Sequence, residues 1–418
     1  MKVSSFGEKL TQKTGILELM DDLGKAMSTH KHMLLLGGGN PAHIPEIDAL
    51  WRKRWQEIAD NSDELERMLG NYTTPQGDDL FIRTVVDFFK RNYQWQITPR
   101  NVTILGGSQT TFFFLFNMLA GKFPDNTKKK ILLPLAPEYI GYADQGITED
   151  MFVSYQPTIE YLEDHTFKYH VNFQDLNMTD VGAICVSRPT NPTGNVLTDD
   201  EVAKLHMLAK EHDVPLIVDN AYGAPFPNIL FTEVTPFWDD QIIYVLTLSK
   251  IGLPSIRTSI VIANEEITEK LTSVNAIVSL STGTVGQHLV MPYLANDEIL
   301  KIGTDIIRPF YQKKAQEAIA LFHQYMQGSN VPYYLHKSEG SLFLWLWCKD
   351  LPITSYELYQ RLKKRDVIVV PGKYFFPGLQ SDWRQKDECL RITYSSQDEE
   401  VVRKGLQIIA EEVKKAYA

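Results

Sequence analysis

Short apolar runs alternate with polar, helix-like segments through the middle of the chain. Apolar runs of this length are typical of strands in a parallel sheet that is covered by helices on both faces. The polar segment from Asp199 to His212, with Thr198 as its N-cap, is typical of a covering helix. The pattern therefore predicts an α/β fold. The predicted strands are Ile131–Leu135, Ala183–Ser187, Pro215–Asp219, Ile242–Thr247 and Thr258–Ala263.

The pattern changes near Arg308, where a second and smaller α+β domain is predicted to begin. A chain of 418 residues also exceeds what one hydrophobic core usually organises. We expect residues 1–50 to contribute to the small domain, 51–307 to form the large domain, and 308–418 to form the C-terminal small domain. After a long helix from Arg308, the expected elements are a strand over Gly340–Trp347, a helix over Tyr356–Arg365, a strand over Leu390–Tyr394 and a terminal helix.

The composition, with 44% hydrophobic and 22% charged residues, is typical of a folded, soluble protein. The formal net charge of -10 makes a nucleic-acid partner unfavourable. The longest run of basic residues, Lys128–Lys130, is predicted to lie in a solvated loop. Residues 1–15 carry no continuous apolar segment, and Phe112–Ala120 is too short to span a bilayer. No membrane partner is expected.

Three cysteines, Cys185, Cys348 and Cys389, are widely separated in the sequence. They lack the spacing of a disulfide framework or of a metal site, which favours a reducing cytoplasm. We expect these cysteines to be buried, and we expect no metal centre.

Polar residues that directly follow the predicted strands are the first candidates for chemistry, because ligands bind beyond the carboxyl ends of parallel strands. Lys250 follows one strand, and desolvation beside other cations can lower the pKa of a lysine enough for Schiff-base chemistry. Asp219 ends another strand, where a carboxylate could keep a pyridine nitrogen protonated. The alternatives are a solvated loop lysine and a carboxylate that only caps the next segment.

Gly106-Gly107-Ser108-Gln109 lies between a predicted strand, Val102–Leu105, and an apolar helix. Its backbone N–H groups and hydroxyl at a helix N-terminus would suit a phosphate group. The segment matches neither the Walker loop nor the dinucleotide-binding fingerprint.

The order of these features along the chain resembles that of the fold type I pyridoxal-phosphate-dependent aminotransferases, over nearly the whole length. The order is the phosphate loop, the aromatic Tyr139, an Asn-Pro turn at Asn191-Pro192, Asp-x-x-Tyr at Asp219–Tyr222, Ser-Lys at Ser249-Lys250 and a following arginine, Arg257. The resemblance implies a large domain built on a mostly parallel, seven-stranded sheet between helices, and a smaller α+β domain. The strings that carry it are Leu35–Ala42, Pro134–Asp144, Cys185–Asn195 and Leu342–Trp347.

By that resemblance the cofactor is pyridoxal 5'-phosphate, held covalently by Lys250. Asp219 would pair with the pyridine nitrogen, Tyr222 and Asn191 would bind the phenolic oxygen, and Tyr139 would stack on the ring. Lys250, Asp219 and Tyr222 are the implied catalytic residues. The phosphate would be enclosed by Gly107, Ser108, Gln109, Thr247, Ser249 and Arg257.

The same resemblance implies a substrate site. Arg391 would grip the substrate α-carboxylate with a bidentate pair, while Gly39 and Asn191 would lie against the substrate. Tyr72 would reach the phosphate of a neighbouring subunit, which implies a homodimer with shared sites. In one departure, Ser255 and Ser259 stand where many relatives have glycine near Arg257.

The implied reaction is a two-stage, ping-pong transamination between amino acids and 2-oxo acids, with Lys250 as both anchor and general acid–base. Resemblance alone implies valine and pyruvate as the substrate pair. Arg188, close to the Asn-Pro turn, leaves aspartate or glutamate open as substrates. The alternatives are another substrate range, a β-lyase or decarboxylase on the same fold, or a regulator that senses the cofactor. The regulator is disfavoured because only a short segment precedes Gly37.

Overall fold

The computed structural model describes residues 2–418 except 13–14, 16, 18–23, 25–32 and 396. Its larger sheet has eight strands in the order β2-β11-β10-β9-β8-β4-β3, with β5 beside β4. The strands are β2 (Val102–Leu105), β3 (Gly121–Lys122), β4 (Lys128–Leu133), β5 (Phe152–Ser154), β8 (Val181–Ser187), β9 (Leu216–Asp219), β10 (Ile242–Thr247) and β11 (Ser259–Ile262).

The predicted mostly parallel sheet is confirmed. Strands β5, β4, β8, β9 and β10 pair in parallel, and β11 runs antiparallel to both β10 and β2. The sheet has eight strands rather than seven because the two-residue β3 pairs antiparallel with β4. The solvated loop predicted for Lys128–Lys130 is wrong: these half-buried lysines begin β4, because the backbone there pairs with β3 on one side and Val181 on the other.

Both faces of the larger sheet are buried, as the apolar strands require. On β9, Ile217 packs into a cluster with Phe112 of α6 (Ser108–Leu119) and with α8 (Glu265–Val278). Its neighbours Leu216 and Val218 point to the other face, into the cluster that holds α5 (Asp79–Tyr93), α7 (Asp199–Glu211) and α9 (Val285–Ala295). Helix α7 begins at the predicted N-cap, where Thr198 and Glu201 form a capping box.

The second sheet has six strands in the order β15-β16-β13-β12-β7-β6. Its first four strands come from the C-terminal part of the chain, whereas the β6–β7 hairpin comes from the middle and joins through parallel pairing of β7 with β12. The predicted domain boundaries stay a prediction, but residues 158–170 belong to this sheet. The strands are β6 (Thr158–Tyr161), β7 (Thr166–His170), β12 (Tyr333–His336), β13 (Phe343–Cys348), β15 (Val370–Pro371) and β16 (Cys389–Thr393).

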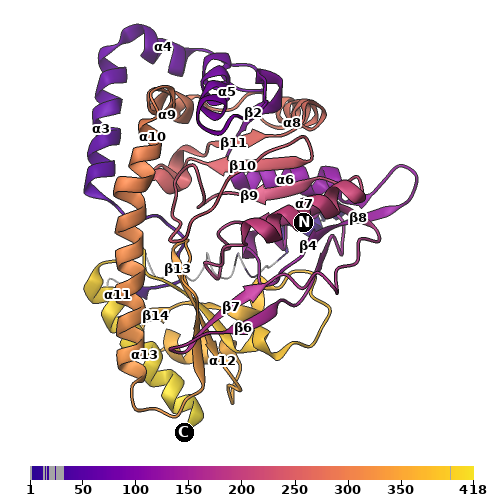
Figure 1. The fold of residues 1–418 in the computed structure, drawn as a ribbon. Helices are drawn as coiled ribbons and strands as arrows, with labels where there is room; N and C mark the ends of the chain where they lie inside the picture. The colour runs from indigo at the N-terminus through magenta and orange to yellow at the C-terminus, as the bar shows by residue number, and fades with distance from the viewer. Residues whose placement is uncertain (1, 13–14, 16, 18–23, 25–32, 396) are drawn as a thin grey trace.

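Figure 1 shows the larger sheet in the upper half and the second sheet below it, with the long α11 (Arg308–Met326) running alongside both. A two-stranded parallel pair joins β1 (Leu34–Leu35) to β14 (Val367–Ile368). Among the described residues, no helix is both long and apolar enough to cross a membrane. The remaining α-helices described are α1 (Ser5–Leu10), α3 (Pro45–Asp60), α4 (Ser62–Gly70), α10 (Glu298–Lys301), α12 (Ser355–Lys363) and α13 (Glu399–Tyr417).

Candidate active site

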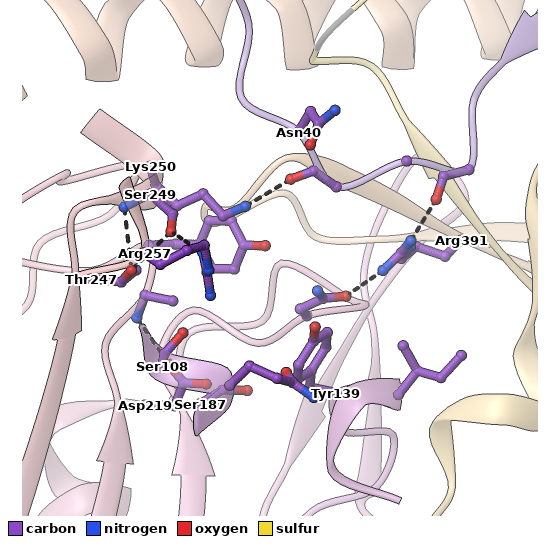
Figure 2. A pocket seen from close by; sticks show the side chains of 18 residues that line it. Asn40, Ser108, Tyr139, Ser187, Asp219, Thr247, Ser249, Lys250, Arg257 and Arg391 are labelled. Atoms are coloured by element: carbon purple, nitrogen blue, oxygen red, sulfur yellow. Dashed lines mark hydrogen bonds between the residues drawn. The ribbon is translucent and has the colours of Figure 1, made fainter. Parts of the chain in front are cut away.

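A cavity of about 490 Å³ opens at the carboxyl ends of the parallel strands. Strand register places the ends of β8, β9 and β10 side by side, because Ser187 and Val245 both lie opposite Asp219. The cavity is lined by Gly37, Gly38, Gly39, Asn40, Ser108, Gln109, Tyr139, Ile140, Ser187, Asn191, Asp219, Ala221, Tyr222, Thr247, Ser249, Lys250, Arg257 and Arg391 (Figure 2).

One end of the cavity is rich in hydrogen-bond donors. Helix α6 begins at Ser108, its N-cap Gly107 provides no side-chain cap for the first N–H groups, and Ser108 and Gln109 of the first turn line the cavity. The Arg257 guanidinium lies directly beside this turn and donates from Nη1 to Ser249 Oγ at 3.2 Å. A β-carbon on Gly107, whose φ is +93°, would lie 2.4 Å from Arg257 Nη2. Glycine is therefore required there for the guanidinium to reach the helix end.

The two serines that replace the usual glycines leave Arg257 in the cavity. Ser259 is buried, and its Oγ lies 2.7 Å from Thr111 Oγ1, so the hydroxyl ties β11 to α6. Ser255 is exposed and has room for its side chain. Arg257 itself adopts a left-handed backbone conformation with φ of +45°.

Lys250 projects into the centre of the cavity. Its Nζ donates to the Gly39 carbonyl at 2.7 Å and lies 5.3 Å from the centroid of the Tyr222 ring. Burial, together with the charges of Arg391 and Arg257, lowers the pKa of Lys250 to about 8, and the charge of Asp219 acts in the opposite direction. A lysine with this pKa exchanges its proton near neutral pH, so the amine is available as a nucleophile and a base.

Asp219 is a buried carboxyl on the floor of the cavity. Its Oδ2 accepts a hydrogen bond from the Tyr142 hydroxyl at 2.6 Å, and its Oδ1 accepts one from the Ala221 N–H at 3.0 Å. Burial raises the pKa of Asp219 to about 6, and the Tyr142 hydrogen bond acts in the opposite direction. At neutral pH the group is therefore a buried anion that can pair with a protonated ring nitrogen.

Arg391 lies on the opposite side of the cavity from Lys250 (Figure 2). Its Nη1 donates to Asn191 Oδ1 at 2.8 Å and its Nη2 to the Gly37 carbonyl at 2.7 Å. The guanidinium carbon lies 4.2 Å from the centroid of the Phe343 ring, and the buried Nε has no hydrogen-bond partner. Burial lowers the pKa of Arg391 to about 10. A buried, oriented guanidinium with donors to spare is suited to bind a carboxylate.

All the residues predicted for the site line the cavity except two. Gly107 borders it as the N-cap of α6, and Tyr72 lies on the surface with 84% of its area exposed. Arg188, which left acidic substrates open, does not line the cavity. Its Nε donates to the Leu197 carbonyl and its Nη2 to Asp199, so the guanidinium is already engaged.

Several residues of the site escaped the sequence analysis. Tyr142 and Glu138 flank the predicted Tyr139, and Ser187 ends a predicted strand, yet none was assigned a role. The only signal in the sequence was the presence of the Tyr142 hydroxyl and the Glu138 carboxyl within an otherwise apolar segment. Their partners became visible only in the folded chain, because Tyr142 and Asp219 are 77 residues apart.

Comparisons with known proteins agree with this geometry. The sequence matches the family described as aminotransferase class I and II over residues 31–409. It is 44% identical to the valine–pyruvate aminotransferase of Escherichia coli strain K12, in an alignment that covers 100% of this chain and 99% of that relative.

Two solved structures share the fold along all or nearly all of the chain. A putative amino-acid aminotransferase from Psychrobacter arcticum 273-4 has a TM-score of 0.97 at 43% identity, covering 100% of this chain and 99% of that one. A valine–pyruvate aminotransferase from Salmonella typhimurium LT2 has a TM-score of 0.88 at 43% identity, covering 96% of this chain and 99% of that one.

Proposed function

This chain belongs to the class I and II aminotransferases, and from that membership we propose that it transfers an amino group between L-valine and pyruvate. The products are 3-methyl-2-oxobutanoate and L-alanine. The observation that carries the substrate choice is the 44% identity, over the full length, to a valine–pyruvate aminotransferase. As in the family, the enzyme is a transaminase that depends on pyridoxal phosphate.

The side chains of the cavity fit that cofactor. The uncapped N-terminus of α6, Ser249 and the fixed positive charge of Arg257 are suited to a phosphate dianion. Lys250 supplies an amine for the aldehyde carbon, and the buried Asp219 supplies an anion for the ring nitrogen. We therefore propose that these residues hold the cofactor, with Tyr139 against the ring.

When bound, pyridoxal phosphate supplies a conjugated ring that accepts the electron pair released at the substrate α-carbon. Arg391 binds the α-carboxylate through its fork of N–H groups, and Asn191 keeps the guanidinium in place. Lys250 would remove the α-proton and deliver it to the carbon on the other side of the substrate nitrogen, the former aldehyde carbon of the cofactor, because its pKa of about 8 allows it to act as base and then as acid. Asp219 holds a proton on the ring nitrogen.

The charge of the cavity favours an apolar substrate side chain. Arg391 and Arg257 are the arginines among the lining residues, and we assign them to the α-carboxylate and the phosphate. Arg188 is bound to Asp199, so among the described residues no arginine remains for a side-chain carboxylate. Ile140 adds an apolar surface to the wall. Valine and alanine suit this cavity better than aspartate or glutamate.

A single half-reaction tests the proposal. The purified protein is loaded with pyridoxal phosphate, and the visible absorbance of the bound cofactor is followed as valine, alanine, aspartate or tyrosine is added separately. We expect valine and alanine to remove the absorbance and pyruvate to restore it. Ammonia or carbon dioxide release in place of 2-oxo acid, or a response to aspartate but not to valine, would contradict the proposal.

The Tyr142–Asp219 hydrogen bond leads to a prediction about pH. Burial already raises the pKa of Asp219, and the Tyr142 hydroxyl opposes this by stabilising the carboxylate. Tyr142→Phe removes that hydrogen bond, so the carboxylate forms only at higher pH. Since hydrogen bonds to charged groups contribute about 1.5–3 kcal/mol, the acid limb of kcat/KM against pH is expected to move up by about one to two units.

Tyr169→Phe is the matched control for this measurement. Tyr169 is also fully buried, but its hydroxyl donates to Gln385 Oε1 at 2.6 Å and not to Asp219. Its removal is expected to leave the acid limb in place. An unchanged acid limb in the Tyr142→Phe enzyme would show that this hydrogen bond does not control the ionisation of Asp219.

We also propose that two copies of the chain associate and share their sites. Tyr72 is expected to contact a phosphate, yet it is exposed and does not line the cavity of its own chain. It lies on a surface of exposed apolar side chains that come from two segments of the chain, 69–72 and 277–280. A hydrogen bond from Asn275 Nδ2 to the Pro75 carbonyl, at 2.8 Å, connects the regions of these two segments. A second copy would bury this apolar surface. The surface consists of Leu69, Tyr72, Ile277, Val278 and Leu280.

Ile277→Asp is expected to dissociate the dimer, because Ile277 has 87% of its area exposed in the single chain and a charge there would be buried on association. Sedimentation velocity would show the wild type as a dimer and the variant as a monomer at the same concentration. Met207→Asp, at an exposed methionine on α7, is the control and should stay dimeric. A monomeric wild type would contradict the proposal.

The cysteines support a proposal about the cellular setting. Cys185, Cys348 and Cys389 are all buried and free, which suits a reducing compartment. We propose that the enzyme works in the cytoplasm on small amino acids and 2-oxo acids.

A further inference from the structure

Glu138 is a buried carboxyl that the mechanism above does not use. It follows β4 in the loop that leads to Tyr139, and only 3% of its area is exposed. Its Oε1 accepts a hydrogen bond from the Ser187 N–H at 3.0 Å. Its Oε2 accepts from the Ser187 hydroxyl at 2.7 Å and from the Tyr139 N–H at 3.1 Å. Both carboxyl oxygens are therefore engaged by groups of the cavity wall.

Three parts of the cavity meet at this residue. The side chain joins the loop of Tyr139 to the end of β8, where Ser187 precedes the turn that carries Asn191. The backbone N–H of Glu138 donates to the Phe375 carbonyl at 2.8 Å, and the Phe375 ring centroid lies 5.2 Å from the Arg391 guanidinium carbon. Glu138 thus links the loop of Tyr139, the start of the Asn-Pro turn and the Phe375 segment that packs beside Arg391.

A carboxyl is a costly group at this position. Burial, with a smaller contribution from the nearby Asp219, raises the pKa of Glu138 to about 8, although the hydrogen bonds from Ser187 and Tyr139 act in the opposite direction. An apolar side chain would avoid this desolvation, but it could not accept hydrogen bonds from two backbone N–H groups and a hydroxyl. A carboxyl at this position is explained by its three donors, because it holds the Ser187 N–H, the Ser187 hydroxyl and the Tyr139 N–H in a fixed arrangement.

We propose that Glu138 is a positioning residue, which holds Tyr139 against the end of β8 and so sets the place of the cofactor ring. The inference rests on the proposed function in one respect, that this cavity holds pyridoxal phosphate. It does not depend on which amino acid is the substrate.

Glu138→Gln tests the proposal with little change in shape. In one orientation the glutamine NH₂ group faces the Ser187 N–H, and in the other it faces the Tyr139 N–H. One backbone donor loses its acceptor in either case. We expect the apoprotein to bind pyridoxal phosphate about tenfold more weakly. At saturating cofactor, the visible circular dichroism per mole of bound cofactor should also fall, because that signal depends on the orientation of the cofactor ring in its asymmetric surroundings.

Ser187→Ala is the second variant, and it decides the question if Glu138→Gln does not fold. It removes only the hydroxyl donor, so roughly threefold weaker cofactor binding and a smaller change in circular dichroism are expected. Glu163→Gln, at an exposed glutamate between β6 and β7, is the control and should match the wild type. Thermal unfolding of each apoprotein is measured in parallel.

Wild-type cofactor affinity and an unchanged dichroism per bound cofactor, in every variant that folds, would overturn the proposal. The same holds if only the unfolding temperature falls, because Glu138 would then act on stability alone. These measurements contain no amino acid, so they stay distinct from the test of valine. A wild type that binds the cofactor but does not react with valine would overturn the substrate proposal. The proposal for Glu138 would still be decided by the affinity and dichroism of the variants.

Discussion

Lys250→Ala is expected to slow the conversion of the bound cofactor by valine on the order of 10⁴-fold, and to abolish the visible absorbance of a covalently held cofactor. The substitution removes the amine whose Nζ lies at the centre of the cavity, 2.7 Å from the Gly39 carbonyl. It removes both the proposed anchor of the cofactor and the group that exchanges a proton near neutral pH. Stopped-flow absorbance with saturating valine measures the effect.

Two controls isolate the role of the amine. Lys270→Ala removes an exposed lysine on α8 that pairs with Glu266, and it should leave the half-reaction unchanged. A small primary amine added to Lys250→Ala is expected to recover part of the rate, since the space left by the side chain opens to the cavity. An intact absorbance of the covalent cofactor in Lys250→Ala would refute the assignment.

Arg391→Lys is expected to lower kcat/KM for valine by about 10²- to 10³-fold, equivalent to roughly 3–4 kcal/mol. Arg391 holds Asn191 and Gly37 with two nitrogens and still has a free, buried Nε. A lysine ammonium is a point charge, and it cannot keep both neighbours and offer a planar fork to a carboxylate. Steady-state kinetics on the loaded enzyme measures the loss.

A substrate without the carboxylate shows whether Arg391 acts on that group. 2-Methylpropylamine is valine without its α-carboxylate, and the wild type should prefer valine strongly. In Arg391→Ala most of that preference should disappear, because the two changes remove the same interaction and their effects are not additive. An equal loss of activity toward both compounds would show that Arg391 supports the fold of the site rather than the carboxylate.

Much of the site follows from one rule applied to the sequence. Ligands of parallel α/β sheets bind beyond the carboxyl ends of the strands, and Asp219, Thr247 and Lys250 stand at or just after the ends of buried strands. Buried strands of this kind can be recognised in the sequence as continuous apolar runs, because a strand covered on both faces must be apolar along its whole length. The order of the motifs then led to the family, which the comparisons confirm.

The errors and omissions share another origin. Lys128–Lys130 looked like a solvated loop because three charges rarely begin a central strand, yet pairing with β3 and β8 recruits their backbone. The β6–β7 hairpin was not assigned to the second sheet, because its partner β12 is far along the chain. Arg188 stayed open as a substrate ligand until its contact with Asp199 was visible.

The sequence by itself determined the fold class and the family, and it singled out Lys250, Asp219 and Arg391 as candidate site residues, since these inferences depend on local patterns, on the order of motifs and on the resemblance that they carry. Only the tertiary structure decided which groups meet. Arg391 touches Asn191 across 200 residues and Gly37 across 354 residues, and Glu138 meets Ser187 across 49 residues. Such pairs leave no periodic trace in the sequence, because they are set by strand pairing and by the packing of distant segments and not by the propensities of neighbouring residues.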